Sequence, residues 1–134
     1  MFLRHFDDEQ RKQLLIVAFE MMVADGLIRE SEKEVLEALK QELHVFQIDR
    51  EEALGGVQLG VFADRRSQMA AMLKLVAMAF ADREYHEREL KILVRCGREF
   101  GFGIEDMKAV NEWGRRHFEL VKDAERMIDS AGPG

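Results

Sequence analysis

The fold is decided by residues 23–32, which read Val-Ala-Asp-Gly-Leu-Ile-Arg-Glu-Ser-Glu. This stretch ends an apolar segment, supplies a glycine that can terminate a helix, and continues into an acidic segment. Residues 80–89 repeat the arrangement as Phe-Ala-Asp-Arg-Glu-Tyr-His-Glu-Arg-Glu. The repeated pairs share one offset of 57 positions: Asp25 and Asp82, Glu30 and Glu87, Glu32 and Glu89, and Leu36 and Leu93. Matches at a single offset indicate an internal duplication.

The composition is that of an ordinary soluble globular protein. The 134 residues suit one domain, and they are enough to bury a core without disulfides or a structural metal. Apolar residues make up 47% and charged residues 34%, which argues against a disordered chain. The single proline and the scarcity of β-branched runs argue against an all-β fold. The net charge of −6 argues against a nucleic-acid partner, because phosphate binding needs concentrated Lys and Arg.

Cysteine usage and the longest apolar segments bear on the compartment. Cys96 is the single cysteine, so no intramolecular disulfide can form. Its counterpart in the first repeat is Leu39, so we predict a small buried side chain rather than a reactive thiol. Residues 1–7 lack the apolar run and cleavage site of a signal peptide. The apolar blocks at 14–24 and 69–81 are too short to span a bilayer. We therefore expect a cytoplasmic protein without an integral membrane segment.

Capping signals and apolar periodicity predict the helices of the first half. Asp7 and Gln10 form a capping box that should begin a helix, and its apolar part belongs inside a bundle. Ser31 and Glu34 form a second capping box. The apolar stripe of the helix that follows comprises Val35, Leu36, Leu39 and Leu43. A brief helix is expected at 49–54.

The second half repeats this plan. Asp64 or Ser67 should cap a helix that is polar only at Lys74 within residues 69–81. Residues 87–100 should form the covering helix, with a stripe of Leu90, Leu93, Val94 and Phe100. A long helix should follow from Glu105, and its wide apolar face comprises Met107, Val110, Gly114, His117, Phe118, Val121 and Ile128.

These elements predict an all-α fold, a single-domain helical bundle of about six or seven helices spanning residues 1–134. Two repeats related by a pseudo-two-fold axis, at about 7–54 and 64–129, build it. Residues 55–63 read as a linker because three glycines fall within residues 55–60. Residues 130–134 form a frayed tail.

Each repeat contains an Asp-x6-Glu motif, formed by Asp25 with Glu32 and by Asp82 with Glu89. The Glu suits a helix N-terminus, whereas an Asp beside a helix C-terminus needs compensation. If both turns meet at one end of the bundle, each close carboxylate pair would repel by about 4 kcal/mol at an effective dielectric constant near 20. A hard divalent cation, Mg²⁺ or Ca²⁺, would relieve that repulsion. These four residues are therefore the candidate metal ligands.

A purely structural interpretation of the same residues stays open. Asp25 and Asp82 could cap the following helices while the glutamates interact with the helix dipoles, with no ion bound. Arg83 stands where the first repeat has Gly26, and its charge could neutralise the cluster. His86 could be a fifth ligand or an exposed turn histidine.

These motifs resemble the tellurite-resistance TerB-like family. The family pattern is an apolar helix ending in Ala-Asp-Gly, an acidic turn, a Glu and a Leu opening the next helix, and a later Leu-Gly-Ile-x-x-Glu element. The matching positions are residues 24–26, Glu32, Leu36 and 48–51 in one half, and residues 81–82, Glu89, Leu93 and 102–105 in the other. The resemblance covers about residues 10–125. It implies an all-helical pseudo-two-fold bundle with an acidic cation site and a binding role in bacterial stress response.

Two functions follow. The first is a stand-alone stress-response module that binds a divalent cation or a protein partner through the acidic turns. The second is an interaction scaffold or homodimer without a metal, using the long C-terminal helix, where Trp113 and Phe118 are either interface anchors or core residues. Enzymatic activity is not expected, because no Ser/His/Asp or Cys/His spacing and no phosphate-binding loop stands out.

Overall fold

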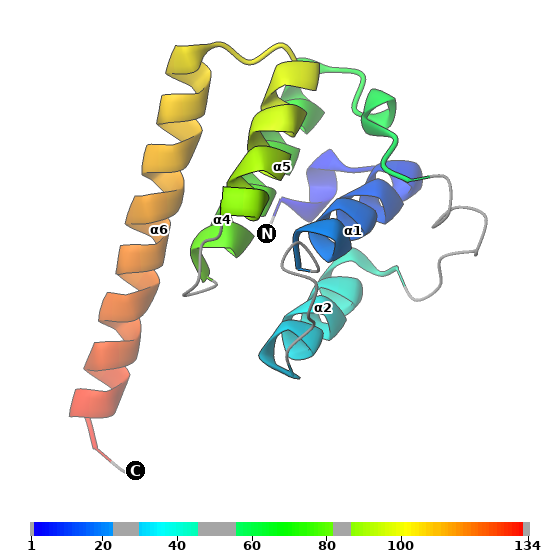
Figure 1. The fold of residues 1–134 in the computed structure, drawn as a ribbon. Coiled ribbons are helices and arrows are strands. Elements are labelled where there is room, and N and C mark those ends of the chain that lie inside the picture. Colours follow the sequence, from blue (N-terminus) through cyan, green and yellow to red (C-terminus); the bar gives the residue numbers. More distant parts are fainter. Residues whose placement is uncertain (1, 23–29, 46–55, 82–86, 133–134) are drawn as a thin grey trace.

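The computed structural model describes residues 2–22, 30–45, 56–81 and 87–132, and every regular element in these ranges is helical (Figure 1). The elements are η1 (Leu3–His5), α1 (Asp8–Met22), α2 (Glu30–Leu43), η2 (Leu59–Val61), α4 (Arg65–Ala81), α5 (Glu87–Glu99) and α6 (Ile104–Ser130). The predicted all-α, single-domain bundle is confirmed, with five α-helices in the described ranges. The brief helix predicted at 49–54 lies outside them, and the pseudo-two-fold relation of two repeats stays a prediction.

Two helix starts predicted from the sequence are confirmed by their hydrogen bonds. The Gln10 backbone N–H donates to Asp7 Oδ1 at 2.8 Å, and the Asp7 N–H donates to Gln10 Oε1 at 2.9 Å, which completes a capping box for α1. The Ser67 N–H donates to Asp64 Oδ1 at 2.7 Å at the start of α4. The capping box predicted at Ser31 and Glu34 does not begin α2, because this helix begins at Glu30 and Ser31 therefore lies within it.

Removing the α1 cap should measurably weaken the fold. Asp7→Ala leaves the Gln10 N–H without its acceptor, and loss of such a cap costs about 1 kcal/mol. Urea unfolding followed by circular dichroism measures this difference in the free energy of unfolding. Asp8→Ala is the matched control, because Asp8 lies in the first turn and makes only a helix-dipole contribution. Equal losses in both variants would contradict the capping assignment.

The core is built on α1 and α4, the two helices whose sequences are apolar on nearly every side. α1 packs against α2 and α5, while α4 packs against α5 and α6 (Figure 1). The core residues that these two helices contribute are Leu14, Leu15, Val17, Ala18, Met21, Ala70, Ala71, Met72, Leu75, Val76 and Ala79. No helix in the described part of the chain combines the length and the apolar character needed to cross a bilayer.

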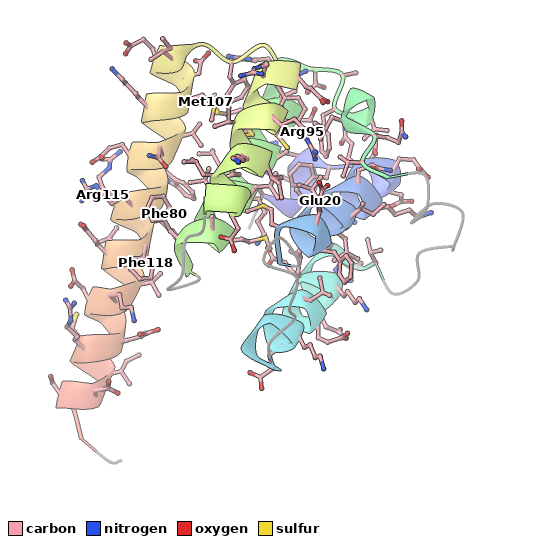
Figure 2. All side chains as sticks on the ribbon, in the orientation of Figure 1. Glu20, Phe80, Arg95, Met107, Arg115 and Phe118 are labelled. Carbon is pink, nitrogen blue, oxygen red and sulfur yellow. The ribbon has the colours of Figure 1, made fainter. Side chains whose placement is uncertain are left out.

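The charged residues that interrupt the apolar blocks form ion pairs between helices. Lys74 Nζ lies 2.7 Å from Glu42 Oε1, which joins α4 to α2. Arg95 Nη2 lies 3.0 Å from Glu20 Oε1, which joins α5 to α1, and Figure 2 shows these two side chains reaching toward one another. These charges therefore sit inside the apolar segments because they face partners on neighbouring helices.

The segment interpreted as a linker contributes to the core. Leu59 in η2 and the adjacent Phe62 are buried. The Phe62 ring makes edge contacts with Phe6 and Phe100, at centroid distances of 6.1 Å and 5.7 Å. The Gln58 N–H also donates to Gln13 Oε1 at 2.7 Å, which ties the segment to α1. Residues 57–62 are therefore a packed part of the domain and not merely a connection.

The apolar stripe predicted for α5 is only partly correct. Leu93 and Phe100 are buried, but Leu90 and Val94 are 43% and 40% exposed. The buried face of the helix comprises Glu89, Ile92, Leu93 and Cys96. Two apolar rows lie side by side on this helix, and α4 and α1 cover the row that contains Ile92 and Cys96. The other row remains at the surface.

The wide face predicted for α6 is covered only in its first half. Val110 and Gly114 are buried against α4, whereas Val121 and Ile128 are exposed. The reason is length, because α6 has 27 residues and α4 has 17. At about 1.5 Å per residue, α6 is longer by roughly 15 Å. Figure 1 shows its C-terminal half running past the end of α4.

Candidate functional site

The four predicted metal ligands are mostly outside the described residues. Asp25 and Asp82 are not described, and Glu32 belongs to α2 but its side chain is not described. Glu89 is described, and it is buried in the first turn of α5. Within the described ranges, no three His, Cys, Asp or Glu side chains gather closely enough to hold one metal ion. The proposed ligand set therefore stays a prediction, as does a role for His86, which also lies outside these ranges.

An uncovered apolar surface lies on the outer half of α6. The α6 stripe, as we call it, comprises Leu120, Val121, Ala124, Met127 and Ile128. Its large side chains are 68%, 43%, 73% and 71% exposed for Leu120, Val121, Met127 and Ile128. Their spacing of three and four residues places them on one face of the helix. Large apolar side chains exposed together in this way need a partner to leave water.

The stripe begins where the contacts of α6 with its own chain end. Trp113 stacks on His117 with ring centroids 5.0 Å apart, and Phe2 packs against Trp113 at 5.9 Å. Gly114 lies directly against Val76 of α4. Trp113 and Phe118, the two candidate interface anchors, are half-buried. They are therefore neither full core residues nor free surface residues.

Ion pairs within α6 support its outer half in the absence of tertiary contacts. Arg115 pairs with Glu112 and with Glu119, at 2.6 Å for the latter. The hydrogen bond from Arg115 lowers the pKa of Glu112, so this carboxylate stays charged. Arg126 pairs with Asp123 at 2.7 Å. Pairs at i,i+3 and i,i+4 each stabilise an exposed helix slightly. The outer half can therefore present the α6 stripe as a formed helix.

A second uncovered apolar surface is a groove of about 590 Å³ between α5 and α6. Its floor is made by Val76 of α4 and Leu93 of α5. Leu90, Val94, Ile104 and Met107 form its walls. The α5–α6 groove forms because both helices rest on α4, while the turn at residues 101–103 closes one end. In Figure 2, Met107 points from α6 toward α5.

The charged side chains at the groove are cationic. Arg98 of α5 and Lys108 of α6 line it, and no acidic residue is among its described lining. Neither cation forms an ion pair with any residue in the described ranges. In a chain of net charge −6, this is a local reversal of sign. The groove therefore favours an apolar ligand that carries acidic groups.

The groove was not predicted from the sequence. Leu90 and Val94 were assigned to the buried stripe of α5, and Arg98 and Lys108 received no role. The available signal was their spacing, because Leu90, Val94 and Arg98 follow one another at four-residue intervals along a single face.

Cys96 is a core residue, as its position in the repeat predicted. The side chain is fully buried, and burial raises the pKa of its thiol to about 11. The native thiol should therefore stay protonated and unreactive toward Ellman's reagent at pH 8, since the thiolate is the nucleophile. Full reaction is expected after unfolding in urea. Rapid labelling of the folded protein at pH 8 would contradict the burial of Cys96.

No protein-family model, curated protein or solved structure matches this chain. The resemblance to the TerB-like family thus rests on the sequence motifs described above.

Proposed function

We propose that this protein is a non-catalytic helical module that binds another protein through the α6 stripe. One observation carries the proposal: four large apolar side chains on one face of a helix, each 43–73% exposed, continue beyond the end of the bundle. Burial of apolar surface contributes about 25 cal/mol per Å², so covering this face stabilises a complex. The family resemblance supports a binding role of this kind in a stress response.

The outer half of α6 is suited to recognition as a helix. Its intrahelical ion pairs hold the polar face, so little conformational entropy remains to be lost when a partner covers the apolar face. An amphipathic helix that places its apolar residues in a hydrophobic groove is a recurring mode of protein recognition. Spacing of three, four and seven residues is the signature of that mode, and the stripe follows it.

Photo-crosslinking from two positions of α6 tests the proposal. A benzophenone amino acid at position 128 replaces Ile128 in the stripe, and one at position 126 replaces Arg126 on the opposite face. The two side chains are 71% and 74% exposed, so exposure is matched and only the face differs. We expect a protein adduct of discrete mass from position 128 and none from position 126. Equal adducts from both positions, or none from position 128, would contradict the proposal.

Divalent-cation binding is a second proposal. The observation that favours it is the repeated Asp-x6-Glu motif, whose one described ligand candidate, Glu89, lies in the first turn of α5 and is 5% exposed. Asp25, Glu32 and Asp82 would complete the site for Mg²⁺ or Ca²⁺. Calorimetric titration with each ion should give heat that is lost when Asp25→Ala and Asp82→Ala are combined. Asp123→Ala is the control on an exposed acidic residue, and unchanged heat in the double variant would end the proposal.

A further inference from the structure

The protein carries two uncovered apolar surfaces of opposite shape. The α6 stripe is convex and projects beyond the bundle, whereas the α5–α6 groove is concave and lies at the other end of α6. The chain cannot bring these surfaces together within one copy, because a continuous helix separates them. Two copies can.

The two surfaces match in length. The stripe spans residues 120–128, which is about 12 Å along the helix axis at 1.5 Å per residue. The α6 wall of the groove spans residues 104–111, which is about 10 Å on the same basis. The groove volume of about 590 Å³ can hold several large apolar side chains, and its exposed rim residues Leu90 and Val94 can cover the flanks of an inserted helix.

The two surfaces also carry opposite charges. Residues 119–130 contain two basic side chains, Lys122 and Arg126, and four acidic ones, so their net charge is −2. The acidic residues are Glu119, Asp123, Glu125 and Asp129. The groove contributes two positive charges, Arg98 and Lys108, and neither is paired with a described residue. A helix of this composition from a second copy would therefore bring acidic side chains to the two cations of the groove.

We propose that the α6 stripe of one copy docks in the α5–α6 groove of a second copy. This inference rests on the proposed function, for which it names the partner. The contact is heterologous, since different surfaces of the two copies meet. In a dimer, one copy therefore retains a free stripe and the other a free groove, unless further copies close a ring. Pairing of stripe with stripe would leave the groove and its two cations uncovered.

Two variants at exposed positions separate the surfaces. The stripe variant combines Leu120→Asp with Ile128→Asp, and the groove variant is Val94→Asp. Because all three side chains are exposed, the variants should keep the fold, which circular dichroism verifies. Arg126→Asp and Lys91→Asp are the controls on α6 and α5, at exposed positions outside the two surfaces.

Sedimentation velocity over a range of protein concentrations measures the association. Wild type and both control variants should associate as the concentration rises. The stripe and groove variants should each stay monomeric, with association weakened by about tenfold or more. An equimolar mixture of these two variants should form a 1:1 dimer and nothing larger, because one intact groove and one intact stripe remain. High salt should weaken that dimer, since charged rims contribute to it.

The remaining outcomes would overturn the inference. If wild type stays monomeric while position 128 still crosslinks to another protein, the second copy is the wrong partner and the proposed function survives. If only the stripe variant loses association and mixing does not restore it, stripe meets stripe. If wild type is monomeric and position 128 gives no adduct, the inference and the proposed function both fail.

Discussion

Replacing Phe62 with alanine should lower the free energy of unfolding by about 3–5 kcal/mol, the range found for large aromatic side chains removed from cores. Phe62 is 2% exposed, and its ring lies between Phe6 and Phe100. The change would leave a cavity where the N-terminal segment, the η2 segment and the end of α5 meet. Urea unfolding followed by circular dichroism measures the loss.

Phe19→Ala is the matched control for this prediction, because it makes the same chemical change on α1 at a side chain that is 45% exposed. Its effect should be well below that of Phe62→Ala, since much of the Phe19 ring stays in water in the folded state. Similar losses in the two variants would show that residues 57–62 are only a connection, as the three glycines within residues 55–60 indicated.

Replacing Gly114 with alanine should separate α4 from α6 and cost about 1–3 kcal/mol. A β carbon at this position would overlap Val76 Cγ1 and come within 2.9 Å of Phe80 Cδ2. The better helix propensity of alanine, worth roughly 1 kcal/mol relative to glycine, offsets part of this cost. Thermal or urea unfolding of the variant measures the net change.

Gly60→Ala is the control, because nothing lies within 4 Å of a β carbon there. That variant should unfold like wild type. A Gly114→Ala variant that is more stable than wild type would mean that the propensity gain outweighs the clash. The close packing of α6 on α4 would then be wrong.

Much of the fold could be predicted because the deciding signals are local or continuous. A helix cap involves only residues that are close in sequence, so the capping box of α1 at Asp7 and the side-chain cap of α4 at Asp64 could be predicted. A helix that is apolar on nearly every side has to lie in the middle of the bundle, so the central positions of α1 and α4 could be predicted. The repeat paired Cys96 with Leu39, and both are buried.

The predictions of buried faces were wrong where one sequence pattern fits two different helix arrangements. On α5, the row with Leu90 and Val94 and the row with Ile92 and Cys96 are both apolar, and only the position of the neighbouring helices decides which is covered. On α6, periodicity continues to Ile128 although α4 ends earlier. The glycines at 55–60 concealed the burial of Leu59 and Phe62.

The candidate site depends on tertiary arrangement even more strongly. The acidic turns at Asp25 and Asp82 were conspicuous in sequence because they repeat, yet their side chains lie outside the described residues. The groove was inconspicuous, since its residues come from three helices and only the packing on α4 brings them together. A repeat therefore revealed one candidate site, whereas the packing of helices revealed the other.

The proposed function requires that another protein covers the outer half of α6. Crosslinking from position 128, compared with position 126 two residues away, decides whether this face of α6 is covered. We expect one adduct of discrete mass from the stripe position and no adduct from the opposite face. Adducts from both faces alike, or a stripe position that captures nothing, would contradict it.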